Sequence, residues 1–201
     1  SDYFAEDDEH ALEIVRDIKE GTGAAITVDA NCAWSAQETL RQLEAMQAFS
    51  LTGVEQPVPG EDIAGMRAVT AAKLVPVVAD ESLCSLQDAR TLIREQACDV
   101  FNVRISKCGG LIRAQDVIHM AAMKNIDCQI GTHVGESFIL DSAGWHLALA
   151  TPNLTYFEGC SFLLHNPSLS VDGTPPSRRK QPEIPGWGLT QSDIDELFAS
   201  S

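Results

Sequence analysis

Six ionisable residues recur along the chain at a nearly constant spacing of 25 to 27 residues. They are Asp29, Glu55, Asp80, Lys107, His133 and Glu158. Each lies at or just beyond the end of an apolar run of the kind that forms a buried strand. Carboxylates, an ammonium group and an imidazole can together bind a cation and transfer protons. Because charged residues that end strands by chance would not keep this period, the pattern predicts one shared chemical site.

A period near 25 residues corresponds to about one strand, one helix and two short loops. Parallel strands that alternate with helices bring their carboxyl ends to the same edge of a sheet. Between the six runs, apolar residues recur every three to four positions, which predicts amphipathic helices. The first helix is expected over about residues 6–19, and Ser35 with Glu38 has the spacing of a capping box that starts the next. We therefore predict six parallel strands joined by helices.

The segment 100–110 is the most informative of the six. Its apolar run ends near Lys107, and Gly109-Gly110 follows before a helical pattern. This order predicts the Lys107 ammonium at the carboxyl end of a strand, the edge where barrels and open α/β sheets carry their chemistry. A lysine in this place can act as a general base or as a Schiff-base nucleophile, and a neighbouring metal ion favours the first.

Three carboxylates at successive strand ends, Asp29, Glu55 and Asp80, suit a hard divalent cation. Mg²⁺ binds a few carboxylates together with water and substrate oxygens. Zinc fits less well, because all three groups are carboxylates and His133 comes two strands later. Taken singly, each carboxylate is better interpreted as a helix N-cap in a strand-to-helix loop, but the three together, followed by an in-phase lysine, favour the metal site.

Three further polar residues follow the last two predicted strands. His133 and Glu136 come after the fifth strand, and Glu158 comes after the sixth. They could be acids or substrate contacts on the opposite face of the substrate from Lys107. Hydrogen-bonded loop residues with no chemical role are an equally good interpretation.

The composition limits the possible partners. A formal net charge of −15 argues against a nucleic-acid-binding protein, because phosphate binding needs a basic face. No apolar run reaches 18 residues, so no membrane span is expected. Residues 1–9 lack the basic start and apolar core of a signal peptide. The six cysteines form no C-x-x-C pair, and we expect buried free thiols and a cytoplasmic location.

Two regions are predicted. Residues 1–165 carry the strands and helices and form a catalytic domain. Residues 166–201 are rich in Pro and Gly and read as an extended tail, which ends in a short helix at Ser192–Phe198.

Four motifs resemble the barrel motifs of the enolase superfamily, in its mandelate racemase/muconate-lactonizing-enzyme subgroup. They are Val28-Asp29-Ala30-Asn31, Val54-Glu55-Gln56-Pro57, Ala79-Asp80-Glu81-Ser82 and Ile105-Ser106-Lys107-Cys108-Gly109-Gly110. The resemblance implies a (β/α) barrel in which the three carboxylates hold Mg²⁺ and Lys107 is the base. It implies a lyase or isomerase (a dehydratase, cycloisomerase, racemase or epimerase) that removes the proton α to a carboxylate through a metal-stabilised enediolate. Asn31 and Glu81 would support the metal and the base.

The chain also departs from the family pattern. The family has eight strands and an N-terminal capping domain, whereas about six strands are predicted here and the cap and the lysine motif of the second strand are absent. The residues around Glu136 differ from the usual glutamate placement after the seventh strand. We therefore expect either a piece of a longer protein, which need not be active alone, or a partial barrel whose first two strands come from elsewhere. The two exposed strand edges of an open barrel favour association, so a homo-oligomer is the other expectation. The alternative is a non-catalytic partial barrel that serves as a binding or interaction module. The expected partner of the enzyme is a small carboxylic acid.

Overall fold

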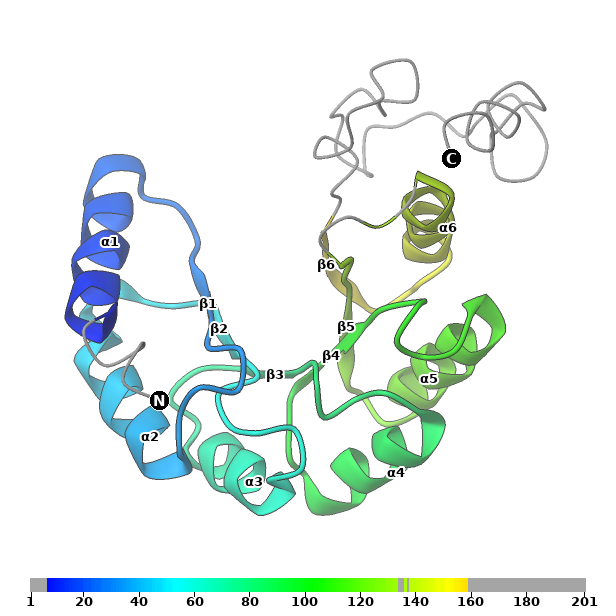
Figure 1. Cartoon of the computed structure of the whole chain (residues 1–201), viewed down its shortest axis with the longest axis horizontal. Coiled ribbons are helices and arrows are strands. Elements are labelled where there is room, and N and C mark those ends of the chain that lie inside the picture. The colour runs from blue at the N-terminus through cyan, green and yellow to red at the C-terminus, as the bar shows by residue number, and fades with distance from the viewer. Residues whose placement is uncertain (1–6, 134–135, 137, 159–201) are drawn as a thin grey trace. The chain divides into compact units, whose positions relative to one another are not determined.

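The computed structural model describes residues 7–133, 136 and 138–158 (Figure 1). Within these residues the six predicted strands are all present, and each is followed or preceded by a helix. The chain divides into two compact units, with the boundary between Asn102 and Val103. The predicted tail 166–201 and its terminal helix lie outside the described residues. No helix in the described ranges has the length and hydropathy that crossing a membrane requires.

The first unit contains four strands in a parallel arrangement that follows chain order, β1-β2-β3-β4. Its elements are α1 (Asp7–Thr22), β1 (Thr27–Asp29), α2 (Ala36–Ala45), the 3-10 helix η1 (Gln47–Phe49), β2 (Gly53–Glu55), α3 (Ile63–Ala72), β3 (Val77–Ala79), α4 (Leu86–Glu95) and β4 (Val100–Val103). Helix α2 packs against α3 and α3 packs against α4, as Figure 1 shows.

The core of the first unit lies between these strands and helices. All residues of β2 and β3 are buried, as expected for parallel strands that are covered on both faces. Val54, Val77 and Phe101 have no solvent exposure, and Met66 of α3 and Leu92 of α4 are equally inaccessible. The positions of the short strands are therefore fixed by the packing of buried side chains between strands and helices.

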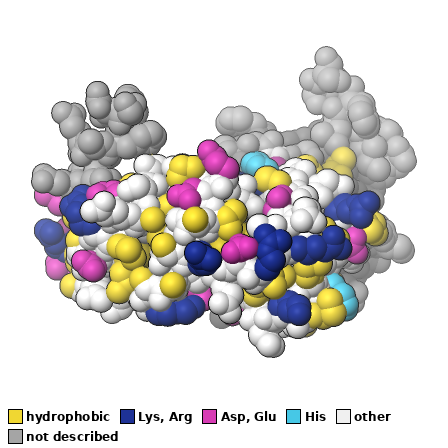
Figure 2. All heavy atoms as spheres, turned by 90° about the horizontal axis from the view of Figure 1, so that it is seen from below, with side chains coloured by type: hydrophobic (Ala, Val, Ile, Leu, Met, Phe, Trp, Pro, Cys, Tyr) yellow, Lys and Arg dark blue, Asp and Glu magenta, His cyan; other side chains and the backbone are white. Residues whose placement is uncertain are grey.

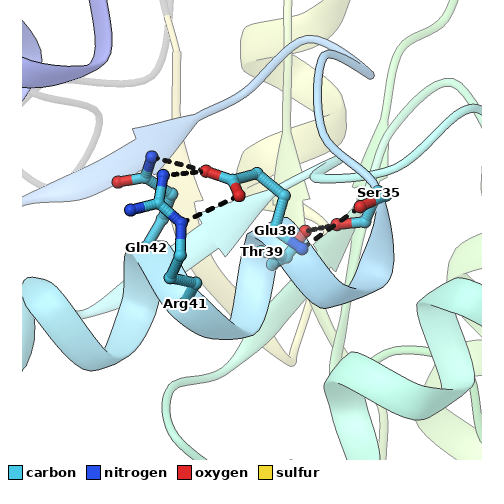
Figure 3. A network of polar contacts seen from close by, with 5 residues as sticks. All are labelled: Ser35, Glu38, Thr39, Arg41 and Gln42. Carbon is cyan, nitrogen blue, oxygen red and sulfur yellow. Dashed lines mark hydrogen bonds and ion pairs between the residues drawn. The ribbon is translucent and has the colours of Figure 1, made fainter.

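Helix α2 begins at the predicted serine, but its capping interactions differ from a full capping box (Figure 3). The Ser35 hydroxyl accepts a hydrogen bond from the Glu38 backbone N–H at 3.2 Å. The Glu38 carboxylate turns along the helix, where it accepts from Arg41 Nε at 2.9 Å and from Gln42 Nε2 at 2.8 Å. The hydrogen bond from Arg41 lowers the pKa of Glu38. Cationic Arg41 thus competes successfully for the carboxylate that would otherwise cap the helix.

The outer surface carries charges of both signs. Arg67 of α3 forms an ion pair with Glu95 of α4, with Nη1 and Oε2 3.5 Å apart, and Lys73 pairs with Asp99 at 2.8 Å. Figure 2 shows basic, acidic and hydrophobic side chains interspersed over this view of the molecule. Such exposed ion pairs contribute little to the free energy of unfolding, about 0–1 kcal/mol each.

The second unit begins with the last residue of β4. It then contains α5 (Leu111–Met123), β5 (Asp127–Ile130), α6 (Phe138–Leu149) and β6 (Leu154–Phe157). The Gly131 N–H donates to the Val103 carbonyl at 3.1 Å, and β5 pairs in parallel with β6. Helices α5 and α6 both pack on β5. The strand order of this unit therefore also follows the chain.

Candidate active site

In the first unit, the backbone register brings the three predicted metal ligands to neighbouring strand ends. Asp29 is the last residue of β1 and is the register partner of Glu55, the last residue of β2. Glu55 is in turn the partner of Val78, and Asp80 directly follows β3. Since adjacent strands lie about 4.8 Å apart, the three backbones that carry these carboxylates are neighbours.

The three carboxylates have different surroundings. Glu55 is 4% exposed and Asp80 is 2% exposed, whereas Asp29 is exposed. The Asn102 side chain, from the middle of β4, donates from Nδ2 to Glu55 Oε1. Asp29 Oδ1 accepts from the Asn31 backbone N–H at 2.9 Å, which closes a tight turn after β1.

The donor chemistry and the backbone fit a hard cation. Buried carboxylates at neighbouring strand ends are stabilised by hydrogen bonds, as Glu55 is by Asn102, and by a cation bound nearby. All three candidate ligands offer carboxylate oxygens. Mg²⁺ prefers oxygen ligands, whereas zinc is usually bound by nitrogen and sulfur. In the described part of the chain, however, no three His, Cys, Asp or Glu side chains lie close enough together to hold a metal ion. The argument for Mg²⁺ at these three residues is therefore their strand register, the burial of Glu55 and Asp80, and their oxygen ligands.

One fully buried residue of this region was not predicted from the sequence. Gln56 is inaccessible to solvent, and its Oε1 accepts from the backbone N–H groups of Asp80 at 2.9 Å and Ser82 at 3.1 Å. Its Nε2 donates to the Val58 carbonyl at 2.9 Å and to the Ser82 hydroxyl at 2.8 Å. The signal in the sequence was a neutral amide in an otherwise buried run. Asn102 carries the same signal in the middle of β4.

The loops after β1 and β3 meet around Cys32. Asn31 and Cys32 both have left-handed backbone conformations, with φ of 45° and 65°. Burial, followed by the nearby charge of Glu81, raises the pKa of the Cys32 thiol to about 11. Cys98, Cys108 and Cys128 are buried free thiols as predicted, but Cys32 is only half-buried and Cys84 is exposed.

The raised pKa predicts slow alkylation of Cys32. Relative to a thiol with the ordinary value of 9.0, a pKa of about 11 leaves about a hundredfold less thiolate at pH 8. Glu81→Gln removes a nearby negative charge and should lower this pKa, so Cys32 should then react faster with iodoacetamide. Peptide mass spectrometry on a Cys84→Ser background measures the rate. An unchanged rate in Glu81→Gln would show that Glu81 does not control the thiol.

In the second unit, the strand before Lys107 is shorter than predicted. β4 ends at Val103, and Lys107 lies four residues further on in a turn. The Cys108 N–H donates to the Arg104 carbonyl at 2.9 Å, and the Gly110 N–H donates to the Ile105 carbonyl at 2.9 Å. Lys107, which is half-buried, is thus held by a compact turn instead of by the strand itself.

The two glycines after Lys107 are required by the backbone. Gly109 has φ of 84° and Gly110, which precedes the first residue of α5, has φ of 108°. Side chains other than hydrogen are strained in this region of φ and ψ. The pair therefore allows the chain to turn from Lys107 directly into the helix.

A second cluster in this unit joins two of the predicted residues to one that was not predicted. Ser106 Oγ lies 2.9 Å from His133 Nδ1 and donates to Glu136 Oε1 at 2.9 Å. His133 Nδ1 is also 3.2 Å from Glu136 Oε1. Glu136 is buried and His133 is exposed. Because the serine and the glutamate both contact the same ring nitrogen, they orient the imidazole and do not form a nucleophilic triad, in which the serine would contact the other nitrogen.

Glu158 follows β6 and is half-buried. Its backbone N–H donates to the Ile130 carbonyl at 2.9 Å, and its carboxylate accepts from the Thr132 N–H at 3.4 Å. Glu158 lies at the end of a strand as predicted, and it contacts the loop that leads to His133.

These motifs and strands define a known class of domain. Residues 3–194 match the family model described as enolase C-terminal domain-like. The chain belongs to this family, and the resemblance read from the four motifs is confirmed, as is the fold class of parallel strands alternating with helices.

Relatives and solved structures within the family are isomerases by name. The chain is 34% identical over 149 residues to an L-amino acid-D/L-Glu epimerase of Sulfurimonas denitrificans, covering 74% of this chain and 43% of that protein. It is 35% identical to an N-succinyl-L-Arg/Lys racemase of Bacillus cereus, covering 76% of this chain and 41% of the relative. The structure of a dipeptide epimerase from Enterococcus faecalis superposes with a TM-score of 0.77 at 32% identity, covering 79% of this chain and 47% of that one. The chain thus spans less than half the length of these relatives.

Proposed function

We propose that the protein is a Mg²⁺-dependent racemase or epimerase that acts at the carbon α to a carboxylate. The observation that carries this proposal is the register of Asp29, Glu55 and Asp80 at three neighbouring strand ends. The names of the relatives, which are epimerases and racemases, support isomerisation over the lyase outcome that the sequence left open.

The metal is assigned to the carboxylates at the strand ends. Asp29, Glu55 and Asp80 would hold the cation, and Asn31 and Glu81 lie next to two of them in the sequence. When bound, Mg²⁺ supplies positive charge that stabilises the negative charge developing on the substrate carboxylate. A solved relative from Enterococcus faecalis is described as a complex with Mg and the dipeptide L-Leu-L-Tyr, which supports this choice of cation.

Proton transfer is assigned to residues of the second unit. We propose that Lys107 Nζ takes the α-proton from one face of the substrate. Racemisation also needs a group that returns a proton to the other face, and His133 is assigned this role. The contacts of Ser106 and Glu136 with His133 Nδ1 support this assignment, because they fix the orientation of the ring. Glu158 is assigned a substrate contact.

The proposed substrate is a small carboxylic acid with an acylated amino group. This class covers dipeptides and N-succinyl amino acids, which appear in the names of the relatives. The five described cysteines are free thiols, which supports a reducing compartment, and we place the protein in the cytoplasm.

The function is tested by α-proton exchange. The protein is incubated in D₂O with Mg²⁺ and a panel of dipeptides and N-succinyl amino acids, and ¹H NMR follows the α-proton signal. We expect one substrate to lose its α-proton signal and EDTA to stop this loss. For a dipeptide the signals of its diastereomer should also grow, and for an N-succinyl amino acid optical rotation should fall. An unsaturated product would indicate a lyase and contradict the proposal, as would absence of exchange across the whole panel.

A further inference from the structure

We infer that Gln56 is a positioning residue for the proposed metal site. Its buried amide fixes the loop that carries Asp80 against the segment directly after Glu55, the last residue of β2, and thereby sets the affinity of the carboxylates for the cation. This inference rests on the proposed function, because it needs the carboxylates to bind a metal ion.

The side chain of Gln56 uses its whole hydrogen-bonding capacity. A primary amide offers two donor hydrogens and two acceptor lone pairs. Oε1 accepts from the N–H groups of Asp80 and Ser82, while Nε2 donates to the Val58 carbonyl and the Ser82 hydroxyl. All four bonds lie between 2.8 and 3.1 Å, in a site with no solvent exposure. Water therefore has no access to replace any of them in the folded protein.

The backbone of Gln56 is hydrogen-bonded to β3 and to the loop after β1. Its N–H donates to the Val78 carbonyl at 3.0 Å, and its carbonyl accepts from the Cys32 N–H at 2.8 Å. Its φ of 32° is unusual for a residue other than glycine. Gln56 is thus bonded to segments that follow β1, β2 and β3, the strands whose ends carry the three proposed ligands.

Metal affinity depends on how well the ligands are held before the ion arrives. Residues that orient ligands without touching the metal typically change metal affinity by about 10–100-fold when they are replaced. The Asp80 backbone N–H donates to Gln56 Oε1. Gln56 directly follows Glu55 in the chain, so this bond links the two proposed ligands. Loss of the amide would leave two buried N–H groups without their acceptor and would let the Asp80 loop move relative to Glu55.

The test compares the same substitution at two buried glutamines of the first unit. Gln56→Met keeps the approximate size of the side chain and removes all four hydrogen bonds. Gln42→Met is the matched control, because Gln42 on α2 is 2% exposed and its amide donates to Glu38 Oε1 on the same helix at 2.8 Å. Mn²⁺ binding, followed by the electron paramagnetic resonance signal of the free ion, gives the affinity of each protein.

We expect Gln56→Met to weaken Mn²⁺ binding by at least about tenfold and Gln42→Met to leave it unchanged. Hydrogen exchange at the Asp80 and Ser82 amides, measured without metal, should be faster in Gln56→Met only. Ser82→Ala is the milder variant, since it removes one acceptor of Nε2 and retains both bonds to Oε1; it should give a smaller loss of affinity. If Gln56→Met does not fold, the inference is tested by comparing the Mn²⁺ affinity of Ser82→Ala with that of Gln42→Met.

The outcomes separate this inference from the proposed function. If the unsubstituted protein does not bind Mn²⁺, the proposed metal site is wrong and the inference falls with it. If the unsubstituted protein binds Mn²⁺ and the Gln56 and Ser82 variants bind it with the same affinity, only the inference is wrong. An equal loss of affinity in Gln42→Met would also overturn it, because the effect would then be one of general destabilisation.

Discussion

Replacing Lys107 with methionine should abolish epimerisation, and exchange of the α-proton in the substrate epimer whose proton faces Lys107, while leaving Mg²⁺ binding intact. Methionine has a similar length but no basic group, so nothing at this position could take the proton. A positioned base typically contributes about 10²–10⁴-fold to the rate, and the loss should be of this size or larger. Exchange is measured by ¹H NMR in D₂O, and Mg²⁺ affinity by calorimetry.

Lys124→Met is the matched control for this experiment. Lys124 follows α5 in the same unit and is exposed, so its loss should affect neither exchange nor binding. If Lys107→Met exchanges the proton at the full rate, the base is another residue, and His133 is the first to test. If metal and substrate binding are lost as well, Lys107 is a structural or carboxylate-binding charge instead of the base.

Replacing Glu55 with glutamine should remove most of the Mg²⁺ affinity. The amide has nearly the same shape as the carboxylate, and its oxygen can still accept the hydrogen bond from Asn102 Nδ2. The substitution therefore removes a negative charge with little disturbance of the packing. Since residues that only orient ligands already change metal affinity by about 10–100-fold, loss of a charged ligand should cost at least about a hundredfold. Calorimetric titration with Mg²⁺ measures the effect.

The control for this substitution is Glu61→Gln. Glu61 lies in the turn before α3 and is exposed, so it tests whether a lower overall negative charge alone weakens the binding of a dication. We expect the affinity of Glu61→Gln to match that of the unsubstituted protein. Equal affinities in Glu55→Gln and the unsubstituted protein would exclude Glu55 from the ligands.

The strand ends could be predicted because they depend on local pattern and on a regular repeat. Asp29, Glu55 and Asp80 follow apolar runs at a constant period, and parallel βα units place such residues at one edge. The position of Lys107 was predicted less well. Ile105 continues the apolar pattern of β4, yet the backbone leaves the strand at Val103 to form the turn that ends at Gly109-Gly110. Apolar residues in such a turn cannot be distinguished from a longer strand by their spacing.

The polar partners of the site could not be predicted, because they come from distant parts of the chain. Gln56 bonds residues 24 and 26 positions away, and Asn102 reaches Glu55 across 47 positions. Ser106 meets His133 and Glu136 at separations of 27 and 30 residues. Nothing in the local pattern distinguishes such a residue from an ordinary polar residue in a buried run. Only the packed backbone determines which donors and acceptors meet.

The hydrogen bonds of Gln56 also constrain how this protein could diversify. The segments after β2 and β3 share one amide, so an insertion or deletion in either would break bonds that belong to both. The loop after β1 is tied to the same residue through the backbone, because the Cys32 N–H donates to the Gln56 carbonyl at 2.8 Å. Over evolutionary time, length changes should therefore be rare close to the ends of all three strands. A library designed to alter substrate preference should likewise keep the lengths of these three loops and keep Gln56 and Ser82 as a pair.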